Sequence, residues 1–473
     1  MTSRAGGLIE LVGRGKKDVF FTANPVVSFF HSVYMKTVPF TKEIYVTQPT
    51  NAPNWGKWVD FDLDHRGDLA RHFYLRIGLP TWLPPYAAAV NPTGIVTDAS
   101  GVTFGYTNSV GYQMLEKVQI FQDQVLIQEF YGEYLAWRGR QMSEVATSTL
   151  MNEQSGSHLE TPLYIGRSAT QAELRVQLPL LGSTDLFDPG MPMGALRQQR
   201  WRVRVYLRKL QELVVASDGR LNPTPWGSSV GNGTPLLVQA TKDGPVETSY
   251  STLALTQMAP LQMSMESTQV YLPRAANLWL KSQTLRFLYV NAQYDEYVIE
   301  DNSFVAASPP YSANVQLPFT VDLIGSVSRL LIGFRSFACT EAGQRYILNA
   351  ADGGPFIQSL RLNISNIDRI KQWPPDVFRE VSAYWKNVRL PLDYVSANPH
   401  NVYTMTFGGY DTFQPCGTLQ FTRAVLPVLY AVLAPIPMDP RNRSRKTSLI
   451  AYAESWNMFE ISGGKGHMMF DDT

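Results

Sequence analysis

The side chains most often used in catalysis and metal binding are scattered along this 473-residue sequence. A zinc hydrolase of the common type needs the pattern His-Glu-x-x-His, and that spacing does not occur. The only two cysteines, Cys339 and Cys416, exclude a disulfide framework and every four-cysteine zinc site. We therefore predict no catalytic residue, no metal site and no cofactor. The histidines, for which we expect structural roles, are His31, His65, His72, His158, His400 and His467.

Two further patterns suggest ligands only weakly. The stretch from Gly13 to Lys17 resembles a phosphate-binding loop, but it lacks the four-residue gap and the Ser or Thr after the lysine. Asp60, Asp62 and Asp64 alternate along a predicted strand and share one face, as the ligands of a cation might. A solvated strand face explains the three aspartates more simply, and we predict no calcium site.

The charge balance disfavours direct contact with a genome. Forty-one Lys and Arg face forty Asp and Glu, which gives a formal net charge of +1. A protein that neutralises packaged nucleic acid needs a far more basic surface, so we expect no direct, sequence-specific binding of nucleic acid. A basic cluster that includes Arg441, Arg443, Arg445 and Lys446 is open to contact with phosphate, a membrane surface or an acidic subunit, but we favour a solvated loop.

Composition points to a large protein with much surface in contact with other protein. Charged residues make up 17% of the chain, against roughly 25% in typical soluble domains, and aromatic residues make up 12%. The amino-terminal residues show no secretion signal, so we expect cytosolic synthesis. The longest apolar run, residues 424–438, is shorter than the roughly 20 residues of a membrane helix and contains three prolines. We interpret this run as a buried strand and its turn.

Period-two alternation dominates the sequence and predicts antiparallel β-structure with one buried face. In the stretch from Trp201 to Arg208, every second residue is apolar and most of the others are arginine. Short helices are predicted only where Phe130, Tyr134 and Trp137 recur at helical spacing, and after Pro375. Similar alternation marks residues 59–64, 73–77, 174–178 and 360–364.

The alternation weakens in the middle of the chain, where Gly, Pro and Asp-Gly turns follow each other closely. We expect a linker or long loop at residues 214–281. Strand-rich segments lie on both sides, at residues 25–213 and 282–473, and each has a size suited to an eight-stranded sandwich. Residues 1–24 form a separate amino-terminal segment.

The amino-terminal forty residues carry a short apolar stretch, then Gly-x-x-Asp, then Thr-x-Asn-Pro, then aromatic residues at fixed distances. This order resembles the signature of the major capsid proteins of nucleocytoplasmic large DNA viruses. Met35, Lys36 and Thr37 depart from it, since the family usually has two basic residues and a histidine there. The matching positions are Gly15, Asp18, Thr22, Asn24, Pro25, Phe29 and Tyr34.

Further matches to this family follow in chain order as far as residue 464. Gly67 and Asp68 lie in a turn before a predicted strand. Two motifs in the carboxyl half match as well, although Cys416 replaces the usual serine. Their matching positions are Asn363, Asp368 and Arg369 in the first, and Gln414, Pro415, Gly417, Thr418, Phe421 and Arg423 in the second.

The resemblance implies an all-β fold of two tandem eight-stranded antiparallel jelly rolls, with long loops and a few short helices. It implies a structural protein rather than an enzyme: a homotrimer that forms a pseudo-hexameric capsomer in the icosahedral shell of a large double-stranded DNA virus. The implied partners are neighbouring capsomers, minor capsid and penton proteins and the internal viral membrane, with residues 1–24 on the capsid interior. The implied location is the virion capsid, assembled inside the infected cell. Loops 81–104, 138–170 and 214–281 are candidates for the outer tower of the capsomer.

Two other functions remain open at this point. A minor capsid or penton protein resembles a single jelly roll, and the length of this chain argues against it. A jelly-roll carbohydrate-binding protein or glycosidase would need aromatic platforms or two carboxylates that converge on one concave face. The sequence alone does not exclude the second alternative.

Overall fold

The computed structural model describes most of the strand-rich parts of the chain. The chain divides into two compact units, Met1–Phe40 and Thr41–Thr473, and only residues 38–40 of the first are described. The described residues are 38–80, 96–98, 102–107, 109–142, 156, 173–181, 190–196, 198–216, 235–238, 248–251, 258–299, 305–306, 314–336, 356–378, 402–408, 417–437 and 447–470.

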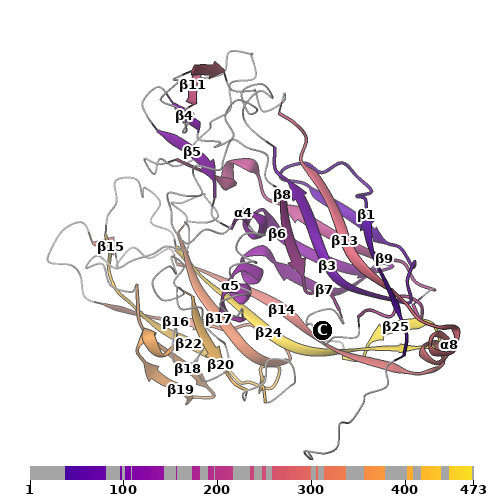
Figure 1. Cartoon of the computed structure of the whole chain (residues 1–473). Helices are drawn as coiled ribbons and strands as arrows, with labels where there is room; N and C mark the ends of the chain where they lie inside the picture. The colour runs from indigo at the N-terminus through magenta and orange to yellow at the C-terminus, as the bar shows by residue number, and fades with distance from the viewer. Residues whose placement is uncertain are drawn as a thin grey trace, which may run out of the picture. The chain divides into compact units, whose positions relative to one another are not determined.

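The first sandwich consists of two four-stranded antiparallel sheets, with strand orders β1-β13-β3-β8 and β2-β9-β6-β7 (Figure 1). Its core is built by the predicted alternation: in β9, Val203 and Val205 are fully buried, whereas Arg202 and Arg204 point outward. The strands are β1 (Thr41–Thr47), β2 (Trp58–Leu63), β3 (Leu69–Gly78), β6 (Leu115–Gln122), β7 (Val125–Tyr131), β8 (Glu173–Leu178), β9 (Trp201–Leu207) and β13 (Gln262–Tyr271).

The second sandwich has the sheets β14-β24-β17-β20 and β16-β22-β18-β19, and two short strands extend the first of these. Its separate core includes Ile332, Phe334, Leu360 and Leu429. The strands are β14 (Leu285–Ile299), β16 (Val315–Thr320), β17 (Ser326–Ser336), β18 (Ile357–Ile364), β19 (Ile367–Trp373), β20 (Tyr403–Thr406), β22 (Val428–Leu433) and β24 (Thr447–Ser462). The short strands are β21 (Leu419–Gln420), paired with β17, and β25 (Lys465–Met468), paired with β24.

The two sandwiches share one strand order. If the eight strands of each are counted from 1 to 8 along the chain, both sandwiches have one sheet in the order 1-8-3-6 and the other in the order 2-7-4-5. This arrangement of two packed antiparallel sheets is a jelly roll. The predicted fold class, two tandem eight-stranded jelly rolls, is therefore confirmed.

Helices are few and short, as predicted, within the described part of the chain. They are α4 (Val110–Gln113), α5 (Gly132–Met142), the 3₁₀ turn η1 (Leu210–Leu213) and α8 (Arg274–Ser282). A further helix begins at Pro375 and is described as far as Phe378. Phe130, which we expected in a helix, instead lies in strand β7, and α5 begins two residues later.

Strands from two of the three expected tower loops form a small sheet of their own, in the order β10-β5-β4-β11-β12 (Figure 1). Loops that are far apart in sequence therefore gather in one place. The direction in which they project on a capsomer stays a prediction. The strands are β4 (Val96–Asp98), β5 (Thr103–Tyr106), β10 (Val214–Ala216), β11 (Pro235–Val238) and β12 (Thr248–Ser251); a separate parallel pair joins β15 (Val305–Ala306) and β23 (Ile436–Pro437).

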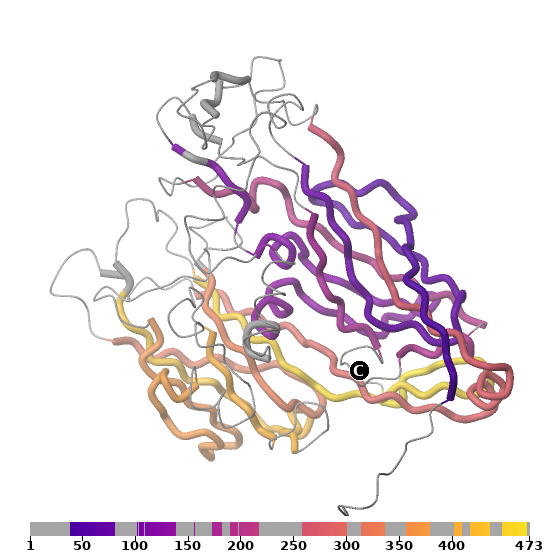
Figure 2. The backbone as a smooth tube through the Cα atoms, in the orientation of Figure 1, coloured from indigo at the N-terminus to yellow at the C-terminus, as the bar shows by residue number. Residues whose placement is uncertain are grey.

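The expected linker at residues 214–281 is not a linker throughout. Strand β13 lies inside the first sheet and pairs with β1 along seven residues and with β3 on its other side. The first sandwich therefore extends to Tyr271 rather than to residue 213, because its eighth strand follows the long loop. Figure 2 shows the chain passing from β13 through α8 directly into β14, where the second sandwich begins.

The expectation of a simple solvated face on β2 is wrong for Asp60. This carboxylate is buried and accepts two hydrogen bonds from Arg204, at 2.8 and 3.0 Å. Asp62 accepts one from Arg202 at 3.2 Å, so β2 and β9 carry a ladder of ion pairs. The Arg204 guanidinium also lies 4.5 Å from the ring centre of Trp58. Asp60 and Asp62 therefore stabilise the pairing of β2 with β9 through these charge-assisted hydrogen bonds.

Candidate functional site at the junction of the two sandwiches

One sheet of the second sandwich is buried on both faces. In strand β24, Leu449 and Ala451 point into the core of their own sandwich, whereas Ile450 and Tyr452 belong to the core of the first sandwich. A half-exposed strand would show alternating burial, but the first nine residues of β24 are all buried. The first sandwich therefore covers the outer face of the β14-β24-β17 sheet.

Helix α5 brings a buried charge cluster to this junction. Arg329 on β17 and Glu454 on β24 form an ion pair in which the side chains are only 7% and 8% exposed. Arg329 Nη2 and Nε donate to the two carboxylate oxygens at 2.5 and 2.9 Å. From α5, the Tyr134 hydroxyl donates to Glu454 at 2.8 Å, and Arg138 Nε lies 3.6 Å from the same oxygen. One carboxylate thus joins the two sandwiches.

The protonation states in this cluster follow from burial and from the neighbouring charges. Burial alone would raise the pKa of Glu454, but the charges of Arg329 and Arg138 outweigh it and lower that pKa. Burial raises the pKa of Tyr134, so the phenol keeps its proton and donates it to the carboxylate. The cluster is therefore a charged, hydrogen-bonded anchor at neutral pH.

A second carboxylate links the sandwiches beside the first. Glu133, the second residue of α5, accepts a hydrogen bond from Arg208 Nη2 at 2.6 Å and another from the Tyr452 hydroxyl at 3.1 Å. Arg208 follows strand β9 of the first sandwich, whereas Tyr452 belongs to the second. The start of α5 is thereby fixed to both.

Aromatic packing fills the space between these polar contacts. Trp137 meets the ring of Tyr452 edge-on, with centroids 5.2 Å apart, and a Cβ atom at Gly333 would lie only 2.5 Å from Trp137 Cη2. Glycine at this position allows the indole to approach the β17 backbone. Tyr131, the last residue of β7, stacks on Tyr294 of β14 at 4.9 Å. Such pairs are worth about 0.5–1.5 kcal/mol each beyond burial.

Strand β7 also contributes polar contacts to β14. Gln128 Nε2 donates to the carbonyl of Val290 at 2.8 Å, and the Tyr289 hydroxyl donates to the carbonyl of Ile127 at 3.3 Å. At the far end of the junction, Gln122 Nε2 donates to the carbonyl of Gly466 at 2.5 Å. The junction therefore extends along both sandwiches, and they form one packed unit.

Acid should weaken this junction. Because the pKa of Glu454 is lowered in the folded chain, its ionisation stabilises the fold above the unfolded value of about 4.5, and this contribution is lost as the pH falls through the lowered pKa. We expect the urea midpoint of the wild type to fall more steeply below pH 4.5 than that of Glu454→Gln. Parallel pH profiles of the two proteins would contradict the assignment.

Gly67 and Asp68, predicted from the family signature, form a second buried junction. A Cβ atom at Gly67 would lie 2.8 Å from Gln269 Oε1, and the Gly67 amide donates to that oxygen at 3.2 Å. Asp68 is buried, and its carboxylate accepts from the Leu272 amide at 2.8 Å and from the side chain of Asn277 in α8. The turn thus fixes the chain as it leaves the first sandwich for the second.

Replacing Asp68 with alanine is expected to lower the free energy of unfolding by about 1–3 kcal/mol, because two partly buried donors, the Leu272 amide and the Asn277 side chain, lose their acceptor. Asp64→Ala is the matched control, since Asp64 is exposed and its partners among the described residues, Tyr45 and Arg66, lie near the surface. Urea denaturation of both variants measures the difference. Equal midpoints would show that the Asp68 carboxylate has no such structural role.

The signature positions of the second sandwich serve two turns. Asn363 Nδ2 donates to Asp368 Oδ1 at 2.9 Å across the tight β18–β19 hairpin, and Arg369 is exposed beside it. Phe421 is a core residue whose amide donates to the carbonyl of Gly325 at 2.9 Å. Three other predicted positions, Gly417, Thr418 and Arg423, are exposed around it, and Gly417 has a φ of 114°.

Half of the predicted signature positions lie outside the described residues. The structure brings the remaining nine into three separate turns, not into one site. Sequence reasoning missed the junction cluster, although the charged residues inside the apolar alternation of β17 and β24 were a usable signal. The positions outside the described residues are Gly15, Asp18, Thr22, Asn24, Pro25, Phe29, Tyr34, Gln414 and Pro415.

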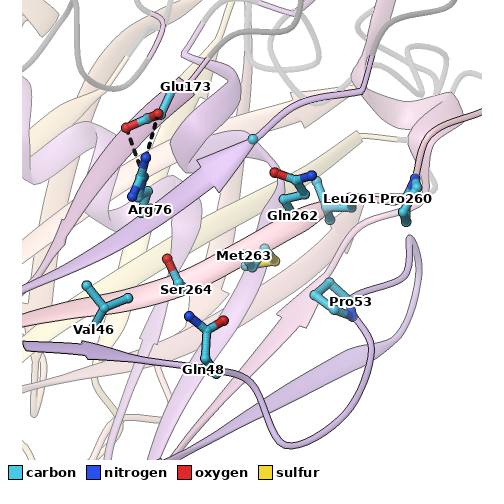
Figure 3. Close-up of a pocket in the computed structure, with 11 residues that line it drawn as sticks. Val46, Gln48, Pro53, Arg76, Glu173, Pro260, Leu261, Gln262, Met263 and Ser264 are labelled. Atoms are coloured by element: carbon cyan, nitrogen blue, oxygen red, sulfur yellow. Dashed lines mark hydrogen bonds and ion pairs between the residues drawn. The ribbon is translucent and has the colours of Figure 1, made fainter.

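A pocket of about 780 Å³ opens on the outer face of the β1-β13-β3-β8 sheet (Figure 3). Among the described residues that line it, Glu173 is the only carboxylate, and it accepts two hydrogen bonds from Arg76, each 2.9 Å long. None of the described lining residues is aromatic. The described part of the lining thus offers neither the paired carboxylates of a glycosidase nor the aromatic platforms of a sugar-binding site.

The described residues offer neither a metal-binding cluster nor a membrane-spanning helix. They contain no cluster of three or more His, Cys, Asp or Glu side chains placed to hold a metal ion. Nor do they include a helix that is both long and apolar enough to cross a membrane.

Two jelly rolls of one strand order, joined by a buried interface, define a double jelly-roll protein. A solved structure of this class, VP54 of the chlorella virus PBCV-1, matches with a TM-score of 0.68 over 94% of this chain and 100% of that one, at 14% identity. Identity this low shows the fold alone. No family model matches the sequence.

Proteins with similar sequences are named as capsid proteins. The chain is 29% identical over 136 residues to "Probable capsid protein 4" of Acanthamoeba polyphaga mimivirus, and 28% identical over 130 residues to the "Major capsid protein" of Pyramimonas orientalis virus. Each match covers 28% of this chain, and the chain spans about a quarter of the length of these relatives, 24% and 28%. The resemblance to the major capsid proteins of nucleocytoplasmic large DNA viruses is confirmed. These relatives are structural proteins, in agreement with the prediction that the chain is not an enzyme.

Proposed function

We propose that this chain is a major capsid protein, and that three copies form the pseudo-hexameric capsomer of a large icosahedral double-stranded DNA virus. The observation that carries the proposal is the repeated strand order of the two sandwiches, held together by a buried interface. A subunit with two similar upright walls, repeated three times, presents six similar walls. Such a block fits a lattice position with six neighbours.

The stiffness of the junction supports this role. A capsomer whose two sandwiches turned independently would not present fixed walls to its neighbours. Here the outer face of β24 is buried, and the Glu454 and Glu133 carboxylates each connect the two sandwiches. Many weak contacts around such a rigid block act together in a shell.

We also propose partners and a location for this protein. The capsomer would contact neighbouring capsomers, minor capsid proteins and penton proteins, and residues 1–24 would face the capsid interior or its membrane. The protein would be made in the cytosol of the infected cell and end in the virion. The glycosidase alternative has no support from the described part of the pocket, where the carboxylate of Glu173 is paired with Arg76.

Light scattering of the purified full chain, coupled to size exclusion, tests the proposal. We expect a stable particle with three times the chain mass of 53.1 kDa. A monomer at all concentrations would contradict it, and a monomer that hydrolyses oligosaccharides would favour the enzyme.

A further inference from the structure

Helix α8 lies at the end of the first sandwich opposite the small sheet of the tower loops (Figure 1). Strand β13 ends at Tyr271, which pairs with the first residue of β1, and α8 begins at Arg274. The β6–β7 hairpin reaches the same end, because Gln122 of β6 and Leu63 of β2 both pair with Trp201. The turn after Leu63 leads into β3 beside the end of β13. Hairpin turns and α8 therefore form this end of the sandwich.

Helix α8 leads directly into β14 of the second sandwich, whose turns at the corresponding end contact one another. The Ser365 amide in the β18–β19 turn donates to the carbonyl of Val425 at 2.9 Å. The Val321 amide, which follows β16, donates to the carbonyl of Pro427 just before β22, also at 2.9 Å. We call α8, the β6–β7 hairpin and the turns at residues 321–325, 365–366 and 421–427, with the side chains that flank them, the base of the chain.

Large apolar side chains are exposed in every part of the base. In α8, Leu278 is 57% and Trp279 is 61% exposed, whereas Leu280 is buried. These exposed side chains come from one helix and from separate turns of two sandwiches. The others include Val125, Ile367, Val425 and Leu426.

The backbone of Leu426 points to a role for its side chain outside the folded chain. Its φ is 46°, in the left-handed region that asparagine and glycine adopt readily and leucine rarely does. The side chain is 71% exposed, so packing within the chain does not compensate for this conformation. Leucine therefore adds nothing to the fold here that asparagine would not add, and its apolar surface is available for an outside contact.

Cationic side chains accompany the apolar ones. In α8, Arg274 lies in the first turn and Lys281 in the last, and the helix contains no acidic residue. The exposed signature positions Arg369 and Arg423 each lie two residues from an exposed apolar side chain of the second sandwich. On the first sandwich, the Arg200 side chain is 79% exposed, and its backbone is hydrogen-bonded to the β6–β7 turn. The base thus combines apolar side chains with positive charge.

We propose that the base binds the surface of an anionic lipid bilayer, with α8 lying in the headgroup region and the apolar turns inserted beside it. The inference rests on the proposed function for the source of the bilayer, the membrane beneath the shell, and adds which residues contact it. A helix with Trp and Leu on its exposed face and basic residues at its ends is typical of helices that lie in a membrane interface. The arginines beside the turns would attract anionic headgroups in the same way.

A bilayer fits the base better than a protein partner does. A stable protein interface buries about 800 Å² on each side, in a patch that is complementary in shape and apolar at its centre. Here the apolar side chains are distributed over a helix and several turns, with cations among them. A fluid surface accepts such separate side chains without matching their shape, and many copies in one shell make weak contacts act together.

Flotation of the purified full chain with lipid vesicles tests the inference. We expect the wild type to float with vesicles made of equal parts of phosphatidylcholine and phosphatidylserine. It should float far less with phosphatidylcholine alone, because the headgroup charge is then missing, and less at high salt, because that charge is screened.

Trp279→Ser and Leu426→Asn test the two apolar parts of the base separately. Each variant withdraws one large apolar side chain from lipid, so we expect the affinity for the mixed vesicles to fall roughly tenfold. Leu426→Asn should also keep or raise the urea midpoint, because asparagine tolerates the left-handed backbone at this position. A purely structural role for Leu426 predicts the opposite result, a lower midpoint with unchanged vesicle binding.

Val298→Asn is the matched control. Val298 is 52% exposed, but it pairs with Ser448 at the end of β14 that lies away from the base. Its replacement should leave the vesicle affinity unchanged. All three variants retain residues 1–37, so any contribution of the amino-terminal segment to binding is the same in each.

A wild type that does not float, or base variants that bind vesicles as tightly as Val298→Asn, would overturn the inference. Binding of another virion protein that depends on Trp279 and Leu426, without binding of vesicles, would assign the base to a protein partner and overturn it as well. Light scattering separates these results from the proposed function. A trimer that does not bind vesicles refutes the inference alone, whereas a monomer that binds them refutes the capsomer.

Discussion

Replacing Glu454 with alanine is expected to lower the free energy of unfolding by about 3–5 kcal/mol, because the buried Arg329 would lose its counter-charge. The Tyr134 hydroxyl of α5 would lose its acceptor in the same step. Because these groups belong to different sandwiches, we also expect a single urea transition to separate into two. Denaturation followed by tryptophan fluorescence and by circular dichroism would detect the separation as non-coincident curves.

The control variant for Glu454→Ala is Glu460→Ala, on the same strand. Glu460 of β24 accepts a hydrogen bond from Arg286 at 2.7 Å, but the Arg286 side chain is 60% exposed. Exposed pairs contribute about 1 kcal/mol or less, so Glu460→Ala should leave the midpoint almost unchanged. If the two variants were equally stable, the buried cluster would not be an anchor.

Replacing Trp137 with alanine is the second change with a large expected effect, a loss of about 3–5 kcal/mol. The indole fills the space between α5 and the second sandwich, against Gly333 and the ring of Tyr452. Its removal leaves a cavity at the junction, where rigid strands limit collapse. We expect a lower urea midpoint and faster proteolysis of the chain near the junction.

Trp58→Ala is the control variant for Trp137→Ala. Trp58 also belongs to the first sandwich, but it is exposed, and the Arg204 guanidinium lies 4.5 Å from its ring centre. A contact of this kind is worth about 1 kcal/mol or less. Similar losses for the two tryptophan variants would mean that packing at the junction does not set the stability of the unit.

The strands were largely predictable because the alternation of buried and exposed side chains involves residues that are adjacent in the sequence. Alternation from Trp201 to Arg208 predicts β9, and the structure places Val203 and Val205 in the core as expected. Strand β13 was missed although Met263 and Met265 alternate with polar residues, because the turn-rich sequence before it suggested a linker. Its partners, β1 and β3, lie about 190 residues or more away in sequence, and period-two alternation carries no information on such pairing.

The junction itself was beyond sequence reasoning of this kind. Its contacts join residues far apart in sequence, some by more than three hundred positions, such as Tyr134 with Glu454 and Glu133 with Tyr452. Alternation indicates which side of a strand is apolar, but it does not indicate whether a second layer of protein covers the polar side. The signature turn at Asp68 was found only through resemblance, and its role, holding α8 and the end of β13, became visible in the fold.

Electron cryomicroscopy of the purified full chain tests the central claim most directly. If three copies form the proposed capsomer, we expect three-fold particles in which six jelly rolls surround one axis. First and second sandwiches should alternate around the ring. Particles that contain two jelly rolls only, or oligomers in which first sandwiches meet first sandwiches, would contradict it.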